Sequence, residues 1–240
     1  MTQREIKNAA ILFAKRNKLK IAKEITDIKT YTPSEMPVSI FMAGSPGAGK
    51  TEFSKGLLKA LLKLFGEKSP KAIRIDGDEL RNYLPGYTGK NSKLFQGAMS
   101  ILVEKAHDLA LKNKQNFILD GTFWKQDKAM ENINRSLAKK RLVLVFYIYQ
   151  PPKVAWDFTK KRELLEGRNI PKSAFIEQFI GARKTIEDVR LKYGEEVVIY
   201  FVEKNYEKNT IEQFTEINTG QSVDQYISSI YTKSALNKIL

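Results

Sequence analysis

The chain has 240 residues, of which 42% are hydrophobic, so it is long enough for one large α/β domain and too apolar to be disordered throughout. It contains no cysteine, which excludes a disulfide scaffold and a cysteine metal site. The net charge of +14 favours an anionic partner such as a nucleotide, a sugar phosphate, nucleic acid or an acidic protein, although a solvated basic surface explains it equally well.

The N-terminal part is predicted to be a helical extension. Residues 1–36 carry a short apolar stripe, then a mostly basic stretch, and they end at a linker that contains Pro33 and Pro37. The remainder is expected to be one domain over residues 37–240. The chain shows no basic-then-apolar leader and no apolar run of membrane-spanning length, so a soluble, cytoplasmic protein without a membrane partner is expected.

Strands and helices alternate along this second part. The predicted strands cover residues 38–43, 72–75, 116–119, 142–149 and 197–202. The predicted helices cover residues 51–65, 96–112, 154–166, 172–192 and 222–233. This alternation predicts an α/β fold of the P-loop NTPase type, with a parallel sheet of about five strands and helices on both faces.

The first predicted strand runs directly into a phosphate-binding loop. The loop consists of Gly44, Ser45, Pro46, Gly47, Ala48, Gly49, Lys50 and Thr51. Its glycines let consecutive backbone N–H groups curl around a phosphate at the partially positive start of a helix. Lys50 adds positive charge at the β- and γ-phosphates, and Thr51 supplies a hydroxyl ligand for Mg²⁺. The motif therefore predicts binding of a nucleoside triphosphate with Mg²⁺.

Acidic residues follow the second and third predicted strands, where ligands of doubly wound sheets bind. A kinase that phosphorylates a hydroxyl needs a carboxylate near the acceptor, and Asp78 is placed for this role just past Gly77. Asp120 suits either a position near Mg²⁺ or a contact to the acceptor. For each aspartate the alternative is a helix N-cap or a turn residue, and Asp76 fits that alternative best.

A basic segment at residues 160–172 separates two predicted helices, which break at residues 167–171. In small P-loop kinases this region is a lid, and its arginines neutralise charge on the transferring phosphoryl group. Arg162 and Arg168 are the candidates for that catalytic role.

Together these motifs resemble the zeta toxin family of P-loop kinases, which phosphorylate UDP-N-acetylglucosamine at a sugar hydroxyl using ATP or GTP. The resemblance covers roughly residues 37–205. It rests on the P-loop, on the Asp76-Gly77-Asp78 turn followed by Pro85 and Tyr87, on Asp120-Gly121-Thr122 where the family usually has Glu-Gly-Thr, and on Arg162 with Arg168-Asn169-Ile170-Pro171-Lys172.

The resemblance implies a role for each matching residue. Lys50 would bind phosphate, Asp78 would be the general base, and Arg162 and Arg168 would contact the γ-phosphate. Asp120 and Thr122 would bind the sugar nucleotide. The Asp-Gly-Asp turn with Arg81 is also similar to that of adenylylsulfate kinases, and Arg81 is a further candidate for substrate binding. Membership of a toxin family would imply a possible antitoxin partner.

The expected function is transfer of the γ-phosphate of ATP or GTP to a sugar nucleotide, with UDP-N-acetylglucosamine as the expected acceptor. One alternative is a P-loop kinase for another small molecule, such as a nucleotide, an adenylylsulfate-like compound or an antibiotic. The other alternative is a nucleotide-dependent nucleic-acid-binding protein, and the charge of +14 favours it. The chain lacks the aromatic–basic pattern of single-strand binders, so nucleic acid is not the expected partner.

Overall fold

The computed structural model describes residues 1–66, 71–205 and 210–240. In these residues one sheet contains six strands in the order β2-β3-β1-β4-β5-β6. The strands are β1 (Val38–Ala43), β2 (Ala72–Asp76), β3 (Asn116–Asp120), β4 (Leu142–Tyr149), β5 (Val198–Asn205) and β6 (Thr210–Glu216). The first five are parallel, and β6 runs antiparallel to β5. The predicted α/β fold with a mostly parallel sheet is confirmed.

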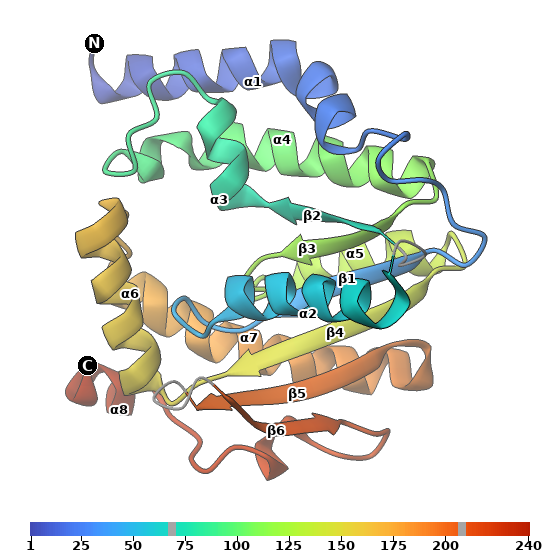
Figure 1. Ribbon diagram of the computed structural model, residues 1–240. Coiled ribbons are helices and arrows are strands. Elements are labelled where there is room, and N and C mark those ends of the chain that lie inside the picture. Colours follow the sequence, from blue (N-terminus) through green and yellow to red (C-terminus); the bar gives the residue numbers. More distant parts are fainter. Residues whose placement is uncertain (67–70, 206–209) are drawn as a thin grey trace.

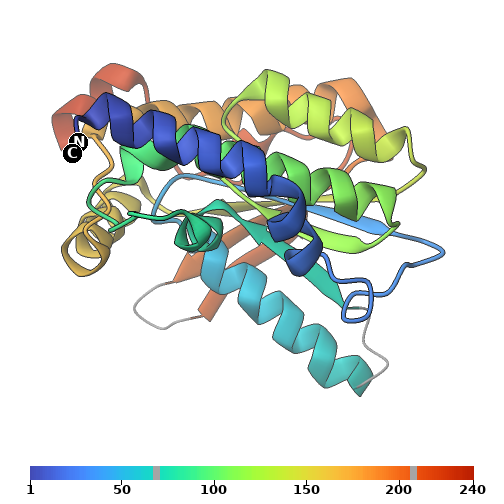
Figure 2. The same ribbon diagram turned by 90° about the horizontal axis from the view of Figure 1, so that it is seen from above.

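Helices cover both faces of the sheet (Figure 1). On one face lies α2 (Lys50–Phe65), and the opposite face carries α4 (Ser92–Lys112), α5 (Gln126–Leu137) and α7 (Lys172–Tyr193), with α1 (Gln3–Ile25) over α4 (Figure 2). The remaining helices are α3 (Gly77–Leu80), α6 (Pro152–Glu166) and α8 (Lys233–Ile239). Among the described residues, no helix is both long enough and apolar enough to cross a membrane.

Strand β4 shows why the sheet is buried on both faces. Val145 and Tyr147 join the core cluster that includes α4 and α7, whereas Phe146 and Ile148 pack in a second cluster with Phe53 of α2. Alternate residues of a strand point to opposite faces, so a continuous apolar run is needed where helices cover both. This packing fixes the ends of the parallel strands next to α2, α3 and α6, where the predicted site residues lie.

Strand β6 was not expected, and it raises the strand number above the predicted five. It pairs with β5 in a register that joins Tyr200 to Glu216 and Val202 to Phe214. Ile211 and Phe214 are about half exposed, so β6 lacks the buried apolar run that marks the other strands. The weak pattern explains why the sequence did not reveal it.

The N-terminal segment packs on the rest of the protein. Ala10, Ala14 and Ile21 of α1 are buried in the same cluster as the sheet residues. After α1, the Gln115 side chain donates hydrogen bonds to the carbonyls of Thr26 (2.9 Å) and Tyr31 (2.7 Å). Helix α1 therefore contributes to the core. That residues 37–240 fold as a domain without residues 1–36 stays a prediction.

The predicted helix over residues 222–233 is wrong. The structure has a 3-10 turn at Val223–Gln225 and places the last helix, α8, at Lys233–Ile239. Thr232 is the N-cap of α8, since its side chain accepts a hydrogen bond from the Ala235 backbone N–H. A threonine that caps a helix marks its beginning, whereas the prediction placed it inside one.

Candidate active site

The P-loop connects β1 to α2 through a backbone that only glycine adopts without strain. Gly44 and Gly47 have φ values of +135° and +73°. A Cβ atom would lie 2.3 Å from the Ile148 carbonyl oxygen at Gly44, and 2.0 Å from the Ala155 carbonyl oxygen at Gly47. The loop is thus held against β4 and α6, and both glycines are required by their backbone and by their neighbours.

The loop has the features that fit the phosphates of a nucleotide. Gly49 is the N-cap of α2 and offers no side chain, so the helix begins with backbone N–H groups that face the loop. The Lys50 ammonium donates hydrogen bonds to the carbonyl oxygens of Gly44 (3.0 Å) and Ser45 (2.6 Å). Thr51 follows in the first turn of α2, where its hydroxyl is an oxygen donor suited to Mg²⁺.

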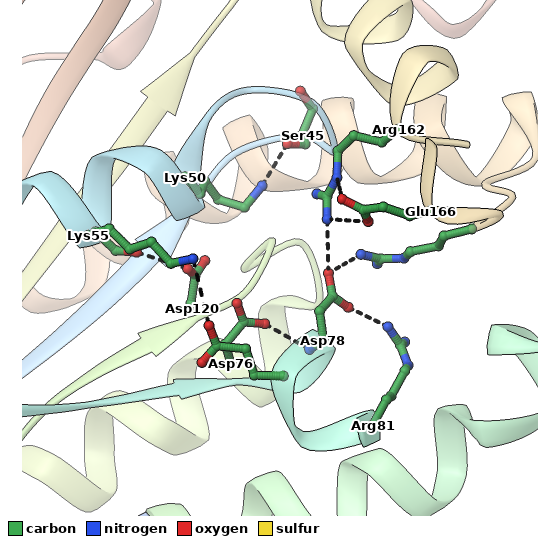
Figure 3. A network of polar contacts seen from close by, with 12 residues as sticks. Ser45, Lys50, Lys55, Asp76, Asp78, Arg81, Asp120, Arg162 and Glu166 are labelled. Carbon is green, nitrogen blue, oxygen red and sulfur yellow. Dashed lines mark hydrogen bonds and ion pairs between the residues drawn. The ribbon is translucent and has the colours of Figure 1, made fainter. Parts of the chain in front are cut away.

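Strand β2 leads to the short helix α3, which carries Asp78. Asp76 is the N-cap of α3, and its Oδ1 accepts a hydrogen bond of 2.8 Å from the Asp78 backbone N–H. The Asp78 carboxylate lies among three arginines: Oδ1 accepts from Arg81, Oδ2 accepts from Arg168, and Arg162 Nη2 lies 3.6 Å from Oδ2 (Figure 3). The structure therefore brings three of the predicted catalytic residues together.

These charges lie near the P-loop lysine. Burial lowers the pKa of Lys50 to about 8, the negative charge of Asp120 opposes this, and Arg168 and Arg162 lower it further. Burial also lowers the pKa of Arg168, and the Asp78 charge counteracts that effect. A group of cations around one carboxylate, facing a phosphate loop, is an arrangement that can bind and stabilise a transferring phosphoryl group.

Asp120 ends β3 beside α2. Its Oδ2 accepts hydrogen bonds from Ser54 Oγ (3.0 Å) and Arg74 Nη1 (2.9 Å). Burial raises its pKa, and the charge of Asp76 raises it further, whereas Lys50 lowers it. Asp120 is thus placed near the P-loop lysine, and its carboxylate is an oxygen donor of the kind that Mg²⁺ prefers.

The comparison with known proteins decides the family. The family model "Zeta toxin" matches residues 22–215. The chain belongs to the zeta toxin family. No curated protein sequence matches the chain at a significant level. The resemblance predicted from the P-loop, the Asp-Gly-Asp turn and the lid is therefore confirmed at the level of the family.

Solved structures show the same fold. A chain of the PezAT chromosomal toxin–antitoxin system of Streptococcus pneumoniae has a TM-score of 0.65 and 15% identity, over 94% of this chain and 90% of that one. A chain of the AvrRxo1-ORF1:-ORF2 complex with ATP has a TM-score of 0.59 and 13% identity, over 93% and 70%. This zeta toxin family member thus has the fold of a P-loop kinase.

In this zeta toxin family member, two further residues that were predicted to bind substrate contact other groups of the protein. Arg81 is buried, and besides Asp78 it bonds Gln96 Oε1 of α4 at 2.7 Å. Thr122 lies after β3, where its backbone oxygen accepts a hydrogen bond of 3.2 Å from the Gly44 N–H. Arg81 thus supports Asp78, and Thr122 supports the P-loop; their contacts to a substrate stay predictions.

Sequence reasoning missed Arg74, whose guanidinium bonds both Asp76 and Asp120. The available signal was its spacing: Arg74 lies two residues before Asp76 in a strand, so the two side chains share a face. It also missed Ser54, which bonds Asp120 from α2, because a serine inside a helix carries no distinctive pattern.

We expect Gly47→Ala to abolish nucleotide binding while the protein stays folded. The new methyl group would collide with the Ala155 carbonyl, and the alanine backbone would have to keep a φ of +73°, so the loop would move. Titration with a fluorescent ATP analogue measures nucleotide binding, and circular dichroism shows whether the protein is folded. Gly56→Ala is the matched control, because a Cβ there meets no atom within 4 Å. Normal binding by Gly47→Ala would show that the loop does not need this geometry.

The nucleotide Kd is expected to rise above pH 8. In the free protein the pKa of Lys50 is about 8, and a bound triphosphate favours the charged ammonium and therefore raises that pKa. The protonated form thus binds more tightly, so affinity is level below pH 8 and falls as the free protein loses this proton. Calorimetric titration across this range measures it. Lys50→Arg, which stays charged, should lack the change, and a level wild-type profile would contradict the assignment.

Proposed function

We propose that the protein transfers the γ-phosphate of ATP or GTP to a hydroxyl of a sugar nucleotide, with UDP-N-acetylglucosamine as the first acceptor to test. The observation that carries the proposal is the convergence of Arg162 and Arg168 on Asp78, facing Lys50 of the P-loop. Membership of the zeta toxin family supports the choice of acceptor class.

Asp78 is the proposed general base. Its carboxylate would accept the proton of the acceptor hydroxyl as the oxygen attacks the γ-phosphorus. In the free protein that carboxylate is paired with Arg81, Arg168 and Arg162. A γ-phosphate competes with Asp78 for the lid arginines, so donor binding would release the carboxylate for its role as base.

Arg162 and Arg168 are the proposed electrostatic catalysts. Arg162 lies near the end of α6, and Arg168 follows the helix directly after Gly167, which has a φ of +72°. Both guanidinium groups would contact the phosphoryl oxygens on which charge develops, and a guanidinium can bond two of these oxygens at once. Lys50 would bind the donor phosphates from the opposite side of the transferring phosphoryl group.

The remaining predicted residues would bind Mg²⁺ and the acceptor. The Thr51 hydroxyl and the Asp120 carboxylate fit Mg²⁺ as oxygen donors, and the ion when bound would neutralise charge on the donor phosphates. Asp120 and Thr122 are the proposed contacts to the sugar nucleotide, so Asp120 has two proposed roles. The variant Asp120→Asn separates them, since loss of a metal ligand raises the Mg²⁺ requirement and loss of an acceptor contact raises the acceptor KM.

A protein partner is also proposed. Similar folds occur in a toxin–antitoxin system and in the AvrRxo1-ORF1:-ORF2 complex. The net charge of +14 would favour an acidic antitoxin. We propose a cytoplasmic location, because a chain without cysteine suits a reducing compartment.

The proposed reaction is tested by mass spectrometry. Purified protein is incubated with ATP, Mg²⁺ and UDP-N-acetylglucosamine, and in parallel with a metabolite extract. We expect UDP-N-acetylglucosamine to gain one phosphate. If another compound in the extract gains a phosphate instead, the protein is a kinase with a different acceptor, and if none does, the proposed reaction is wrong.

A further inference from the structure

Arg74 is a buried cation that the proposed reaction does not use directly. It lies in β2, at the edge of the sheet, and its side chain is only 8% exposed. Ile73 and Ile75 on either side of it point into the core cluster with α4, so Arg74 points to the face that carries α2. A charge in this position needs partners, and the partners are the carboxylates at the strand ends.

Two aspartates stand directly opposite each other beside Arg74. Asp76 of β2 and Asp120 of β3 are register partners, and like charges in this position repel each other. Arg74 Nη1 lies 2.6 Å from Asp76 Oδ2 and 2.9 Å from Asp120 Oδ2, so one nitrogen bridges both carboxylates (Figure 3 shows both aspartates). The other terminal nitrogen of Arg74 bonds Glu79 of α3.

Each of these carboxylates holds another part of the site. Asp76 uses its second oxygen, Oδ1, to bond the backbone N–H of Asp78 at 2.8 Å. Asp120 bonds Ser54 of α2, the helix that begins at Lys50. The contacts therefore run from Arg74 through Asp76 to Asp78, and from Arg74 through Asp120 to the P-loop helix.

We propose that Arg74 is a positioning residue for phosphoryl transfer, which fixes Asp78 by holding the capping carboxylate of Asp76. This inference rests on the proposed function. Without Arg74, Asp76 and Asp120 would repel each other, and the turn that carries Asp78 would lose its anchor. A lysine keeps the charge but lacks the planar fork that reaches Asp76, Asp120 and Glu79 together.

The kinetic test compares Arg74→Met, Arg74→Lys and Asp78→Asn in steady-state transfer to UDP-N-acetylglucosamine. We expect Arg74→Met to lower kcat by roughly 10- to 100-fold with little change in the Kd of ATP, because a misplaced base slows chemistry without removing donor contacts. Arg74→Lys should recover part of the loss. In the Asp78→Asn background, Arg74→Met should cost clearly less than in the wild type, since the carboxylate that it positions is already absent and only its contact with Asp120 is left to lose.

Arg135→Met is the matched control. Arg135 of α5 also bridges two carboxylates, those of Glu104 and Asp108, and both of these lie on α4. We expect its kcat to equal that of the wild type even if its melting temperature falls. A wild-type kcat for Arg74→Met would overturn the proposal, and so would a loss of the same size in the presence and absence of the Asp78 carboxylate.

Hydrogen exchange gives a readout that needs no acceptor. In the free protein, Arg74→Met should speed exchange of the backbone amides in α3, where the Asp78 N–H bonds Asp76, and leave β4 unchanged. Unchanged protection of α3 would overturn the proposal. If the wild type does not phosphorylate UDP-N-acetylglucosamine while α3 exchanges faster in the variant, the proposed acceptor is wrong and the positioning role stands.

Discussion

Asp78→Asn is expected to lower kcat by about 10²–10⁴-fold, the usual cost of removing a general base. The amide keeps the size of the side chain but cannot take the proton of the acceptor hydroxyl. The Asp78 carboxylate in α3 pairs with Arg81, Arg168 and Arg162, so the substitution also weakens three ion pairs. Steady-state transfer of labelled phosphate, with circular dichroism to check folding, measures the effect.

Asp76→Asn is the control for this prediction. The asparagine keeps a carbonyl oxygen that can accept the hydrogen bond from the Asp78 N–H, while it loses the charge that pairs with Arg74. Its effect on kcat should therefore be much smaller than that of Asp78→Asn. If Asp76→Asn were the inactive variant and Asp78→Asn nearly normal, the roles of the two aspartates would be exchanged.

Arg168→Ala is expected to lower kcat by roughly 10²–10³-fold and to change the Kd of ATP little. When ATP binds, the γ-phosphate only replaces Asp78 as the partner of this guanidinium, so the net gain in binding is small. The interaction becomes stronger when negative charge spreads over the oxygens of the transferring phosphoryl group, and an interaction that strengthens in the transition state raises turnover rather than affinity. Arg168→Lys should recover little, because a point charge cannot bond two oxygens in a plane.

Arg162→Ala provides the coupling test for the same residue. Both arginines lie at Asp78 Oδ2, so both are placed to contact one phosphoryl group, and their effects should combine non-additively in the double variant. Wild-type turnover of Arg168→Ala with weakened ATP binding would make Arg168 a ground-state clamp. Unchanged turnover and unchanged ATP binding would show that residues 160–172 are only a solvated basic surface.

The parts of the fold that depend on local patterns could be predicted from the sequence. The apolar run before Gly44 and the amphipathic helix after Lys50 gave β1, the P-loop and α2, because both elements are defined by short-range periodicity. The break between two helices at residues 167–171 was predictable for the same reason: Gly167 and Pro171 end one helix and begin the next, and the structure has α6 end at Glu166 and α7 begin at Lys172.

The parts that depend on distant contacts could not be predicted. Helix α5 was missed although its buried residues recur at helical spacing, because two of the four, Asn132 and Ser136, are polar and are buried only through tertiary packing. The contacts of Arg74 with Asp120 join residues 46 positions apart, and only the register of β2 against β3 brings them together. Similarly, the bond from Arg81 to Gln96 depends on how α3 packs on α4.

The central claim is that Asp78, Arg162 and Arg168 carry out transfer of phosphate to a sugar hydroxyl. Phosphorus NMR tests this claim most directly, with the purified protein, ATP, Mg²⁺ and UDP-N-acetylglucosamine in one sample. We predict that ADP forms together with an equal amount of a new phosphomonoester on UDP-N-acetylglucosamine, and that both signals almost vanish in Asp78→Asn. Formation of ADP and inorganic phosphate alone, at the same rate in the wild type and in Asp78→Asn, would contradict the account.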